Sequence, residues 1–488
     1  MGVVLALDAG TTGVRTRAVF DDGRQSFSAY REFPQYFPQP GWVEHDANEI
    51  WKAIADTLAE VVGQLNEPIA AIGITNQRET ILAWDQRTGE PCSRAIVWQD
   101  RRTAARCEEL APHLSTVRRI TGLVLDPYFS GTKAAWIAAH HDLPPAPHLR
   151  IGTIDTWLVW KLTNGGSFVT DPSNASRTML FDINTMQWSD EMCALIGVPR
   201  DALAEVRPSS SRYGVTTNIS GVPDGIPISG IAGDQQSALF GQMCTQKGMA
   251  KNTYGTGSFV LLNVGTSCPS PTDGMLTTVA WDLGDGAPVY ALEGAIFVTG
   301  AAVQWLRDGL GIIRNASEIG ELAATVPDSG GVYVVPAFTG LGSPWWDPYA
   351  RGTIVGITRG TTKAHIARAV IDAMVFQTRD AIDAMTIAGG VTLNELRVDG
   401  GAAVMDAMLQ RQANELRVPV LRPTDHETTA LGAAYLAGLA EGVWANLDEV
   451  SQMWQLDQRF EPAAESGDHA TWLRAVERSR HWAQDIPE

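Results

Sequence analysis

The stretch VVLALDAGTTGVRTRAVF, Val3 to Phe20, opens the chain with an apolar strand that ends at Asp8, passes through glycines and threonines, and resumes as a second strand. A nucleotide-binding P-loop requires a lysine and a following helix, and this stretch has neither. Its turn offers successive peptide N–H groups, the hydroxyls of Thr11 and Thr12, and the guanidinium of Arg15, all of which suit phosphate oxygens. Asp8 suits a hydrated magnesium ion. The hairpin therefore predicts a phosphate site, with a plain glycine-rich turn as the alternative.

A second hairpin further along the chain has the same construction. In GMAKNTYGTGSFVLLNVG, Gly248 to Gly265, a strand again turns through a Gly-Thr pair and returns as an apolar strand. This repeat predicts two halves of like architecture, divided near Gly241 into an N-terminal domain of residues 1–241 and a C-terminal domain of residues 242–488. The alternative is that any two β-hairpins with glycine turns look alike.

Length and composition narrow the class of protein. A chain of 488 residues exceeds what one core usually supports, so several domains and a cleft between them are expected. The net charge of −18 disfavours nucleic acid and anionic membrane surfaces as partners. The five cysteines form no CxxC pair and the nine histidines form no HxH or HExxH cluster, which argues against the usual zinc and redox motifs. Because the opening apolar run, Val3 to Leu7, is short, we expect a cytoplasmic protein without a signal peptide or membrane insertion.

Alternating strand and helix patterns indicate compact α/β architecture. Residues 46–65 carry apolar side chains at helical spacing, with Asp46 and Glu49 placed as a capping pair, and this helix is expected to cover one face of a sheet. A second helix is predicted over residues 365–385, where a wide apolar stripe implies a buried position that joins the domains.

Three further segments extend the phosphate hypothesis. YGTGSF, Tyr254 to Phe259, is a second candidate phosphate clamp, and LRVDGGAAVMDAMLQ, Leu396 to Gln410, has a strand, a glycine pair and a helix fit for adenosine. GIAGDQQSALFG ends a strand in Asp234. In this order the segments resemble the actin, hexokinase and sugar-kinase superfamily, in which two ribonuclease-H-like domains close on ATP.

The resemblance extends below the superfamily. The segments GWVEHD, ITNQRET, DPYFSGTK, ASRTMLF, GIAGDQQSALFGQ, KNTYGTGSF and VYVVPAFTGLGSPWWDPYARG are similar to the motifs of the glycerol kinases in the FGGY family of carbohydrate kinases, and they are spread over nearly the whole chain. The resemblance implies two ribonuclease-H-like (actin-like ATPase) domains that flank a central catalytic cleft. It also implies phosphorylation of glycerol to sn-glycerol 3-phosphate, with ATP and Mg²⁺ as cofactors, by a homodimer or homotetramer.

Site residues follow from the resemblance, motif by motif. Asp234 is expected to be the general base and, with Asp8, to face the metal. Arg78 and Glu79 are expected to hold two hydroxyls of the substrate. The remaining substrate contacts implied are Gln235, Trp98, Tyr128 and Phe259, and the nucleotide contacts implied are Thr11, Thr12, Gly13, Arg15, Gly255, Thr256, Gly300, Gln304, Gly401 and Met405.

The residues alone leave other interpretations open. Trp98 and Phe259 stand near strand ends, where core packing is the common role of an aromatic ring. Arg78 and Glu79 are also consistent with a surface ion pair. Asp234 follows a glycine after an apolar strand, where a helix N-cap is the usual explanation.

Two departures from the family pattern concern the nucleotide. The family often has two serines where Gly13 and Val14 stand, although peptide N–H groups survive that change. Met405 stands where the family usually places an asparagine that bonds the adenine edge, and a thioether is a weak acceptor and no donor. The alternative is that Asp406, one residue on, takes that role.

Two other functions remain as alternatives. Another FGGY kinase would act on a pentulose or a longer polyol, but the NQRET segment is of the type found in glycerol kinases. A non-catalytic ATP-sensing scaffold would keep the fold, but it would have no need of both Asp8 and Asp234.

Overall fold

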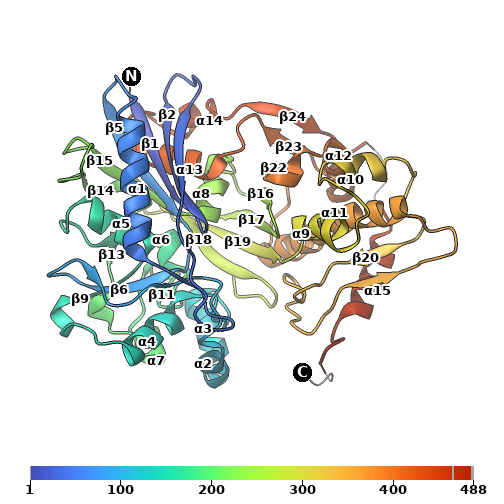
Figure 1. Cartoon of the computed structure of the whole chain (residues 1–488), viewed down its shortest axis with the longest axis horizontal. Helices are drawn as coiled ribbons and strands as arrows, with labels where there is room; N and C mark the ends of the chain where they lie inside the picture. Colours follow the sequence, from blue (N-terminus) through green and yellow to red (C-terminus); the bar gives the residue numbers. More distant parts are fainter. Residues whose placement is uncertain (1, 464–466, 485–488) are drawn as a thin grey trace.

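The computed structural model describes residues 2–463 and 467–484, and its core contains two large mixed sheets in two lobes (Figure 1). In the first sheet β1 is antiparallel to β2 and parallel to β5. The strand order of this sheet is β14 (Ser210–Val215), β15 (Pro227–Gly233), β5 (Ile69–Asn76), β1 (Val3–Ala9), β2 (Gly13–Phe20) and β3 (Phe27–Glu32).

The second sheet repeats this arrangement. Its order is β18 (Leu276–Trp281), β19 (Val289–Ile296), β17 (Ser258–Gly265), β16 (Met249–Tyr254), β22 (Glu395–Asp399), β23 (Val420–Pro423) and β24 (Leu456–Phe460). The path β3-β2-β1-β5-β15 and the path β19-β17-β16-β22-β23 share one pattern of antiparallel and parallel neighbours. The internal repeat and the α/β fold with two ribonuclease-H-like sheets are therefore confirmed.

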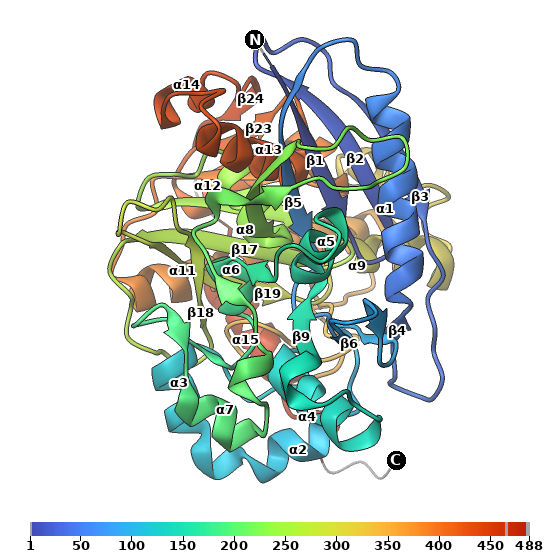
Figure 2. The ribbon, with the colours of Figure 1, turned by 90° about the vertical axis from the view of Figure 1, so that its left-hand side faces the viewer.

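Helices cover both faces of the first sheet. Alternate residues of β1 point to opposite faces, so Val3, Leu5 and Leu7 pack with α1 (Ala47–Val62), whereas Val4 and Ala6 pack with α13 (Thr428–Ala440). Figure 2 shows α1 along the outer face, near α5 (Ile154–Leu162). The Asp46 carboxylate accepts the first free N–H groups of α1, so the Asp46 cap and the predicted sheet-covering position are confirmed. Glu49 does not complete the predicted capping pair, because its carboxylate accepts from the Tyr36 hydroxyl instead.

Helices α8 (Asp234–Gly241) and α13 (Thr428–Ala440) form the layer between the two sheets. They touch backbone to backbone, since a Cβ at Gly241 would lie 1.9 Å from the Thr428 carbonyl oxygen, and one at Gly432 would lie 1.9 Å from that of Ser237. A helix from the C-terminal half thus packs directly on the first sheet, while α8 contacts both sheets.

The predicted helix over residues 365–385 exists as α11 (Lys363–Gly389), but its predicted role of joining the domains is wrong. It packs against β17 and β19 on one side and α10 (Glu318–Ala323) and α12 (Asp406–Leu416) on another, all within the C-terminal half. Its wide apolar stripe results from contacts with several elements of its own lobe.

A smaller sheet and its helices complete the N-terminal half below the first sheet (Figure 1). No helix within residues 2–463 and 467–484 is long and apolar enough to cross a membrane. The smaller elements of the N-terminal half are β4 (Glu44–His45), β6 (Ile81–Asp85), β7 (Glu90–Pro91), β8 (Ala95–Ile96), α2 (Ala104–Glu109), α3 (Leu114–Thr121), α4 (Ser130–His140), β9 (Leu149–Thr153), β10 (Val169–Thr170), α6 (Pro172–Ala175), β11 (Phe181–Asp182), β12 (Gln187–Trp188), α7 (Asp190–Ile196) and β13 (Glu205–Val206). The smaller elements of the C-terminal half are α9 (Gly300–Gln304), β20 (Tyr333–Val335), β21 (Thr353–Val355), α14 (Leu447–Ser451) and α15 (His469–Ser479).

Candidate active site between the two sheets

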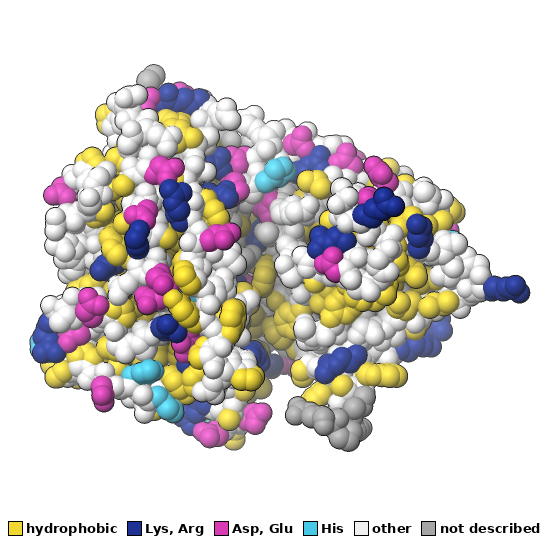
Figure 3. Space-filling model, viewed as in Figure 1, with side chains coloured by type: hydrophobic (Ala, Val, Ile, Leu, Met, Phe, Trp, Pro, Cys, Tyr) yellow, Lys and Arg dark blue, Asp and Glu magenta, His cyan; other side chains and the backbone are white. Residues whose placement is uncertain are grey.

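The carboxyl ends of three parallel strands of the first sheet bring the main polar residues together. Asp8 lies next to the end of β1, Arg78 follows β5, and Asp234 begins α8 directly after β15. Because β5 is parallel to both neighbours, these ends meet at one edge of the sheet, where α/β proteins bind their ligands. The space-filling view shows a groove between the two lobes at this level (Figure 3).

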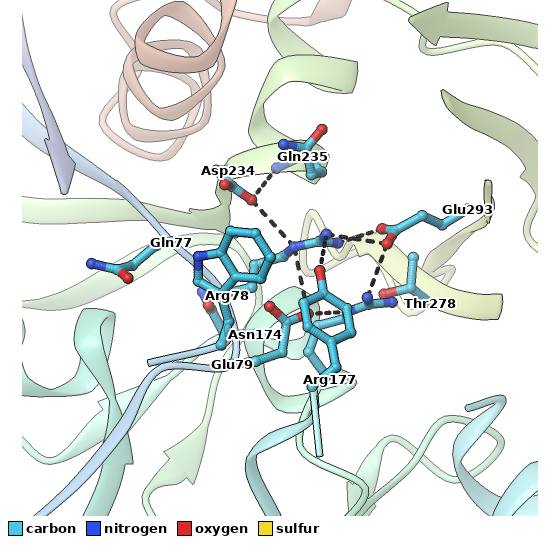
Figure 4. A network of polar contacts seen from close by, with 12 residues as sticks. Gln77, Arg78, Glu79, Asn174, Arg177, Asp234, Gln235, Thr278 and Glu293 are labelled. Carbon is cyan, nitrogen blue, oxygen red and sulfur yellow. Dashed lines mark hydrogen bonds and ion pairs between the residues drawn. The ribbon is translucent and has the colours of Figure 1, made fainter. Parts of the chain in front are cut away.

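Arg78 is the centre of a buried polar network (Figure 4). Its Nε lies 3.2 Å from Oδ1 of Asp234, and its Nη2 donates to the Tyr128 hydroxyl at 3.2 Å. Its Nη1 lies 2.5 Å from Oε2 of Glu293, and its Nη2 lies 3.2 Å from Oε1 of the same residue. The side chains of Arg78 and Glu79 are each 2% exposed, so the interpretation as a surface ion pair is wrong.

Arg177 is the second arginine of this network. Its Nε donates to Glu79 at 2.6 Å and its Nη2 donates to Glu293 at 2.9 Å. Burial favours neutral Glu293, but Arg177 and Arg78 outweigh that effect and lower its pKa to about 2. Both arginines therefore share one ionised carboxylate.

Arg177 and Glu293 were not assigned roles from the sequence. A signal existed for Glu293, because a charged residue in the middle of the apolar strand VYALEGAI is costly unless it is paired. Arg177 lies in the quoted ASRTMLF segment, between residues that are themselves buried.

Asp234 is the first residue of α8, and the N-cap of that helix is Gly233. Its Oδ1 accepts the peptide N–H of Gln235 at 2.7 Å in addition to the contact from Arg78. The carboxylate thus faces Arg78 rather than capping the helix, and the N-cap interpretation is wrong. Burial raises the pKa of Asp234, while Arg78 and the Gln235 N–H oppose the rise.

Gln235 is held from the second sheet. Nζ of Lys251, on β16, donates to Oε1 of Gln235 at 2.5 Å and to the Thr253 hydroxyl at 3.0 Å. Burial lowers the pKa of Lys251 to about 8, although Asp399 and Asp234 favour its charged form. Lys251 had no predicted role.

Trp98 and Tyr128, two of the three aromatic residues predicted to contact the substrate, lie side by side. The rings of Trp98 and Tyr128 meet edge to face, with centroids 5.7 Å apart, and both side chains are half-buried. The indole Nε1 of Trp98 donates to the hydroxyl of Thr11 at 3.0 Å. Phe259 is also half-buried but lies on β17 of the second sheet, opposite Thr253 and Ala295.

The first predicted phosphate hairpin turns between β1 and β2. Side-chain amides of Gln77 and Gln35 donate to the carbonyl oxygens of Gly10 and Thr11, at 2.9 and 3.1 Å, and fix the turn. Thr12 is exposed. A Cβ at Gly13 would lie 2.4 Å from the Tyr30 hydroxyl and 2.7 Å from the Arg31 carbonyl oxygen, which explains why this chain has no serine there.

Arg15 is engaged by the C-terminal half. Its Nη1 forms an ion pair with Glu427, and the neighbouring Arg17 forms one with Asp425. Both carboxylates lie in the segment between β23 and α13, so two ion pairs join the lobes beside the hairpin. A phosphate group at Arg15 would have to compete with Glu427.

The second predicted phosphate turn lies beside α9. The carbonyl oxygen of Gly255 accepts the N–H of Gly300 at 3.0 Å, and that of Thr256 accepts the N–H groups of Thr299 and Ala301. Gln304 ends α9 and is exposed.

The adenosine segment is adjacent to this turn. Gly400 has φ 87°, and a Cβ there would lie 2.5 Å from the Tyr254 carbonyl oxygen, which brings Gly401 beside the turn. Met405 is half-buried and stands at the N-cap of α12. Asp406 instead pairs with Arg422 at 2.8 Å. The predicted nucleotide residues of the C-terminal half therefore form one group, and those of the first hairpin form another.

Asp8 and Asp234, the two candidate metal ligands, influence each other electrostatically. Burial raises the pKa of Asp8 to about 7, with further contributions from the charges of Asp234 and Glu427. Oxygen donors of this kind suit Mg²⁺, whose charge would relieve the repulsion. Residues 2–463 and 467–484 contain no group of three or more His, Cys, Asp or Glu side chains that could hold a metal.

Two family models match the chain. The model of the FGGY family of carbohydrate kinases, N-terminal domain, matches residues 3–241, and that of the C-terminal domain matches residues 250–441. A curated glycerol kinase of Trichlorobacter lovleyi is 54% identical over 497 residues, covering 99% of this chain and 100% of the relative. One of Deinococcus radiodurans is 53% identical, covering 99% of this chain and 98% of the relative.

Solved structures resemble the chain over its whole length. The crystal structure of Plasmodium falciparum glycerol kinase with ADP has a TM-score of 0.92 at 34% identity, covering 98% of each chain. A ligand-bound xylulose kinase from Lactobacillus acidophilus has a TM-score of 0.85 at 21% identity, covering 98% of this chain and 97% of that one. The latter likeness concerns the fold alone.

Proposed function

This chain belongs to the FGGY family of carbohydrate kinases, and we propose that it transfers the γ-phosphoryl group of ATP to glycerol, giving sn-glycerol 3-phosphate and ADP. The observation that carries the proposal is the contact of Arg78 with Asp234 at the carboxyl edge of the first sheet, 3.2 Å apart. It supplies a donor for a small polyol beside a carboxylate that can accept a proton. Glycerol kinases that are 53 and 54% identical over nearly the full length support the choice of substrate.

Glycerol binds, in this proposal, between Arg78, Glu79 and the aromatic walls. Because glycerol has little carbon surface, its affinity depends on hydrogen bonds, which Arg78 and Glu79 supply to two hydroxyls. Gln235 contributes a third polar contact. Trp98, Tyr128 and Phe259 bury the carbon side of the substrate and exclude water that would compete for the phosphoryl group.

Asp234 acts as the general base. One oxygen of Asp234 is taken by Arg78 and the Gln235 N–H, and within the described residues no hydrogen bond or ion pair involves its Oδ2. Oδ2 accepts the proton of the primary hydroxyl while the glycerol oxygen bonds to the γ-phosphorus and the bond to ADP breaks. Burial raises the pKa of Asp234, and the charge of Arg78 opposes that rise.

The nucleotide lies, in this proposal, across both groups of residues described above. Thr11, Thr12, Gly13 and Arg15 contact phosphates from the first hairpin. The second group, which reaches toward the adenosine, consists of Gly255, Thr256, Gly300, Gln304, Gly401 and Met405. Asp8 and Asp234 would hold Mg²⁺, which supplies charge neutralisation on the phosphates.

The domain division is proposed at the end of α8. Residues 1–241 then hold the glycerol residues other than Phe259, the first hairpin and Asp234, and residues 242–488 hold Phe259, the second turn and the adenosine segment. The two separate sheets support this division. A cytoplasmic homodimer or homotetramer remains a prediction, and light scattering on the purified protein tests the assembly.

Substrate choice is tested by ADP release in a coupled assay with MgATP. Glycerol, xylulose, ribulose and gluconate are compared at equal concentrations, and glycerol should exceed each sugar in kcat/KM by about 10² or more, because unmatched hydroxyls would be buried unpaired. A pentulose turned over as efficiently as glycerol would favour a different FGGY kinase. Nucleotide binding without any turnover would favour an ATP-sensing scaffold.

A further inference from the structure

Glu293 is a fully buried carboxylate that belongs to the second sheet but bonds only arginines of the N-terminal half in the described structure. Its Oε2 lies 2.5 Å from Nη1 of Arg78, and its Oε1 lies 3.2 Å from Nη2 of Arg78 and 2.9 Å from Nη2 of Arg177. Its side chain and that of Arg177 are 0% exposed. Figure 4 shows Glu293 on one side of the guanidinium group of Arg78 and Asp234 on the other. The nitrogens of this group, Nε, Nη1 and Nη2, are called the Arg78 fork below.

Strand register explains how Glu293 reaches across. Lys251 on β16, Leu261 on β17 and Glu293 on β19 are direct neighbours, so their side chains share one face of the second sheet. Lys251 contacts Gln235 and Glu293 contacts Arg78, so this row faces the predicted glycerol residues. The second sheet thus contributes a cation and an anion, in addition to Phe259, to a site whose catalytic carboxylate follows the first sheet.

The Arg78 fork has two possible acidic partners, and the choice affects Asp234. At present Glu293 is the carboxylate bonded to both Nη atoms, which also donate to the neutral side chains of Gln236 and Tyr128, and Asp234 contacts Nε. An arginine pairs most strongly with a carboxylate through two parallel bonds. Without Glu293, the fork would be free to form such a pair with Asp234 and would occupy the carboxylate oxygen that the substrate hydroxyl needs.

We propose that Glu293 is a positioning residue for glycerol: from the second sheet it holds Nη1 and Nη2 of Arg78, which keeps one oxygen of Asp234 open and directs the fork to the substrate. This inference rests on the proposed function. It makes glycerol binding depend on the arrangement of the two sheets, because the residue that orients the glycerol-binding arginine lies on the opposite lobe.

The first test is Glu293→Gln, which keeps the shape and removes the charge. We expect KM for glycerol to rise about 10-fold or more, since the bond to a charged partner is lost, while KM for ATP stays within about two-fold. Calorimetry of glycerol binding without nucleotide should show the same loss. Glu293→Asp keeps the charge on a shorter side chain and should restore part of the affinity.

A matched control is Glu415→Gln. Glu415 is also a buried carboxylate paired with an arginine, Arg379, but it lies on α12 away from the site. If Glu293 only stabilises the fold, both variants will lower the unfolding temperature and leave KM for glycerol unchanged, and the inference is then wrong.

A double-mutant cycle tests whether Glu293 affects glycerol binding through Arg78. If Glu293 acts through Arg78, then Glu293→Gln in an Arg78→Gln background should change glycerol affinity by less than about two-fold, because the oriented group is already absent. Fully additive effects would overturn the inference. If Glu293→Gln does not fold, Glu293→Asp decides, since glycerol affinity equal to the native value would contradict the proposal. A native protein that neither binds nor phosphorylates glycerol would instead overturn the proposed function.

Discussion

The indole Nε1 of Trp98 donates a hydrogen bond to the hydroxyl of Thr11 at 3.0 Å. Trp98 lies beside Tyr128 in the proposed glycerol wall, whereas Thr11 lies in the turn of the proposed phosphate hairpin. One bond therefore joins the two pockets. Any movement of the hairpin upon phosphate binding changes the position of the indole, so the two ligands should influence each other's affinity.

The first prediction concerns this coupling. Trp98→Phe keeps an aromatic wall but removes the donor, and Thr11→Val removes the acceptor. Each should reduce the effect of glycerol on the affinity for a non-hydrolysable ATP analogue by about 2- to 10-fold, the equivalent of one net hydrogen bond. Calorimetric titrations with and without glycerol measure this factor. Trp188→Phe is the control, because it removes an indole donor that bonds the Ala204 carbonyl oxygen and touches neither proposed ligand, and an unchanged factor in both test variants would contradict the prediction.

Asp234→Asn should abolish base catalysis while keeping the local structure. The amide oxygen can still accept the Gln235 N–H, which Oδ1 of Asp234 accepts now at 2.7 Å. Turnover should fall at least about 10²-fold, because the side chain no longer accepts a proton. ATP binding, followed by calorimetry, should survive. Normal turnover with glycerol would rule out Asp234 as the base.

Much of the fold could be predicted from the sequence because its signals are local. Alternation in Val3 to Phe20 and in Gly248 to Gly265 predicted both hairpins, and the structure confirms the repeat that they indicated. The position of α11 could not be predicted, since an apolar stripe shows that a helix is buried but not what buries it. The small residues of α13 had no obvious meaning until the backbone contacts of Gly241 and Gly432 were seen.

Residues of the site could be predicted from the sequence only where they lie within a continuous motif. Arg78, Glu79 and Asp234 lie in recognisable segments, and the structure brings them together. Glu293 was missed because its partner is distant in sequence: it pairs with Arg78 across 215 residues. Lys251 was missed although its partner Gln235 is only 16 residues away. The Arg78–Glu293 partnership depends on how the edges of two separate sheets face each other, which sequence spacing does not specify.

Asp8 should make stability depend on pH. Its pKa in the folded protein is about 7, raised by burial and by Asp234 and Glu427, whereas an unfolded chain has a value of about 4. Between these values the native state binds more protons than the unfolded one, so stability falls as pH rises through that window. Asp8→Asn should therefore raise the unfolding temperature at pH 8 by about 2 °C or more, with a gain that shrinks toward pH 4.

Thermal denaturation with and without Mg²⁺ checks this prediction. Mg²⁺ should raise the unfolding temperature of the native protein at pH 8 and have little effect on Asp8→Asn. Asp85→Asn is a control of opposite sign, because a hydrogen bond from Arg87 lowers the pKa of Asp85 to about 2. That variant should lose stability, not gain it, above pH 4. A pH-independent effect of Asp8→Asn would show that the carboxyl is ionised throughout.

Met405 has two consequences for the nucleotide site. It occupies the N-cap of α12 without a side-chain bond to the helix, and the family resemblance aligns it with an asparagine that would bond the adenine edge. The alternative donor or acceptor, Asp406, is 57% exposed and paired with Arg422. The native protein should therefore use ATP but discriminate only modestly against GTP or ITP, since a thioether packs on a purine without reading its edge.

Met405→Asn is expected to change two measurements at once. Its side-chain oxygen can cap α12, which should raise stability by about 1 kcal/mol, and its amide can bond the base at a gain of about 0.5 to 1.5 kcal/mol. The preference for ATP over GTP should rise about 2- to 10-fold in kcat/KM at saturating glycerol and magnesium. Met405→Ser separates the effects, because serine caps the helix on a side chain too short to reach the base. If the native enzyme already selects ATP strongly and Met405→Asn gains stability without selectivity, then position 405 caps the helix and does not face the nucleotide.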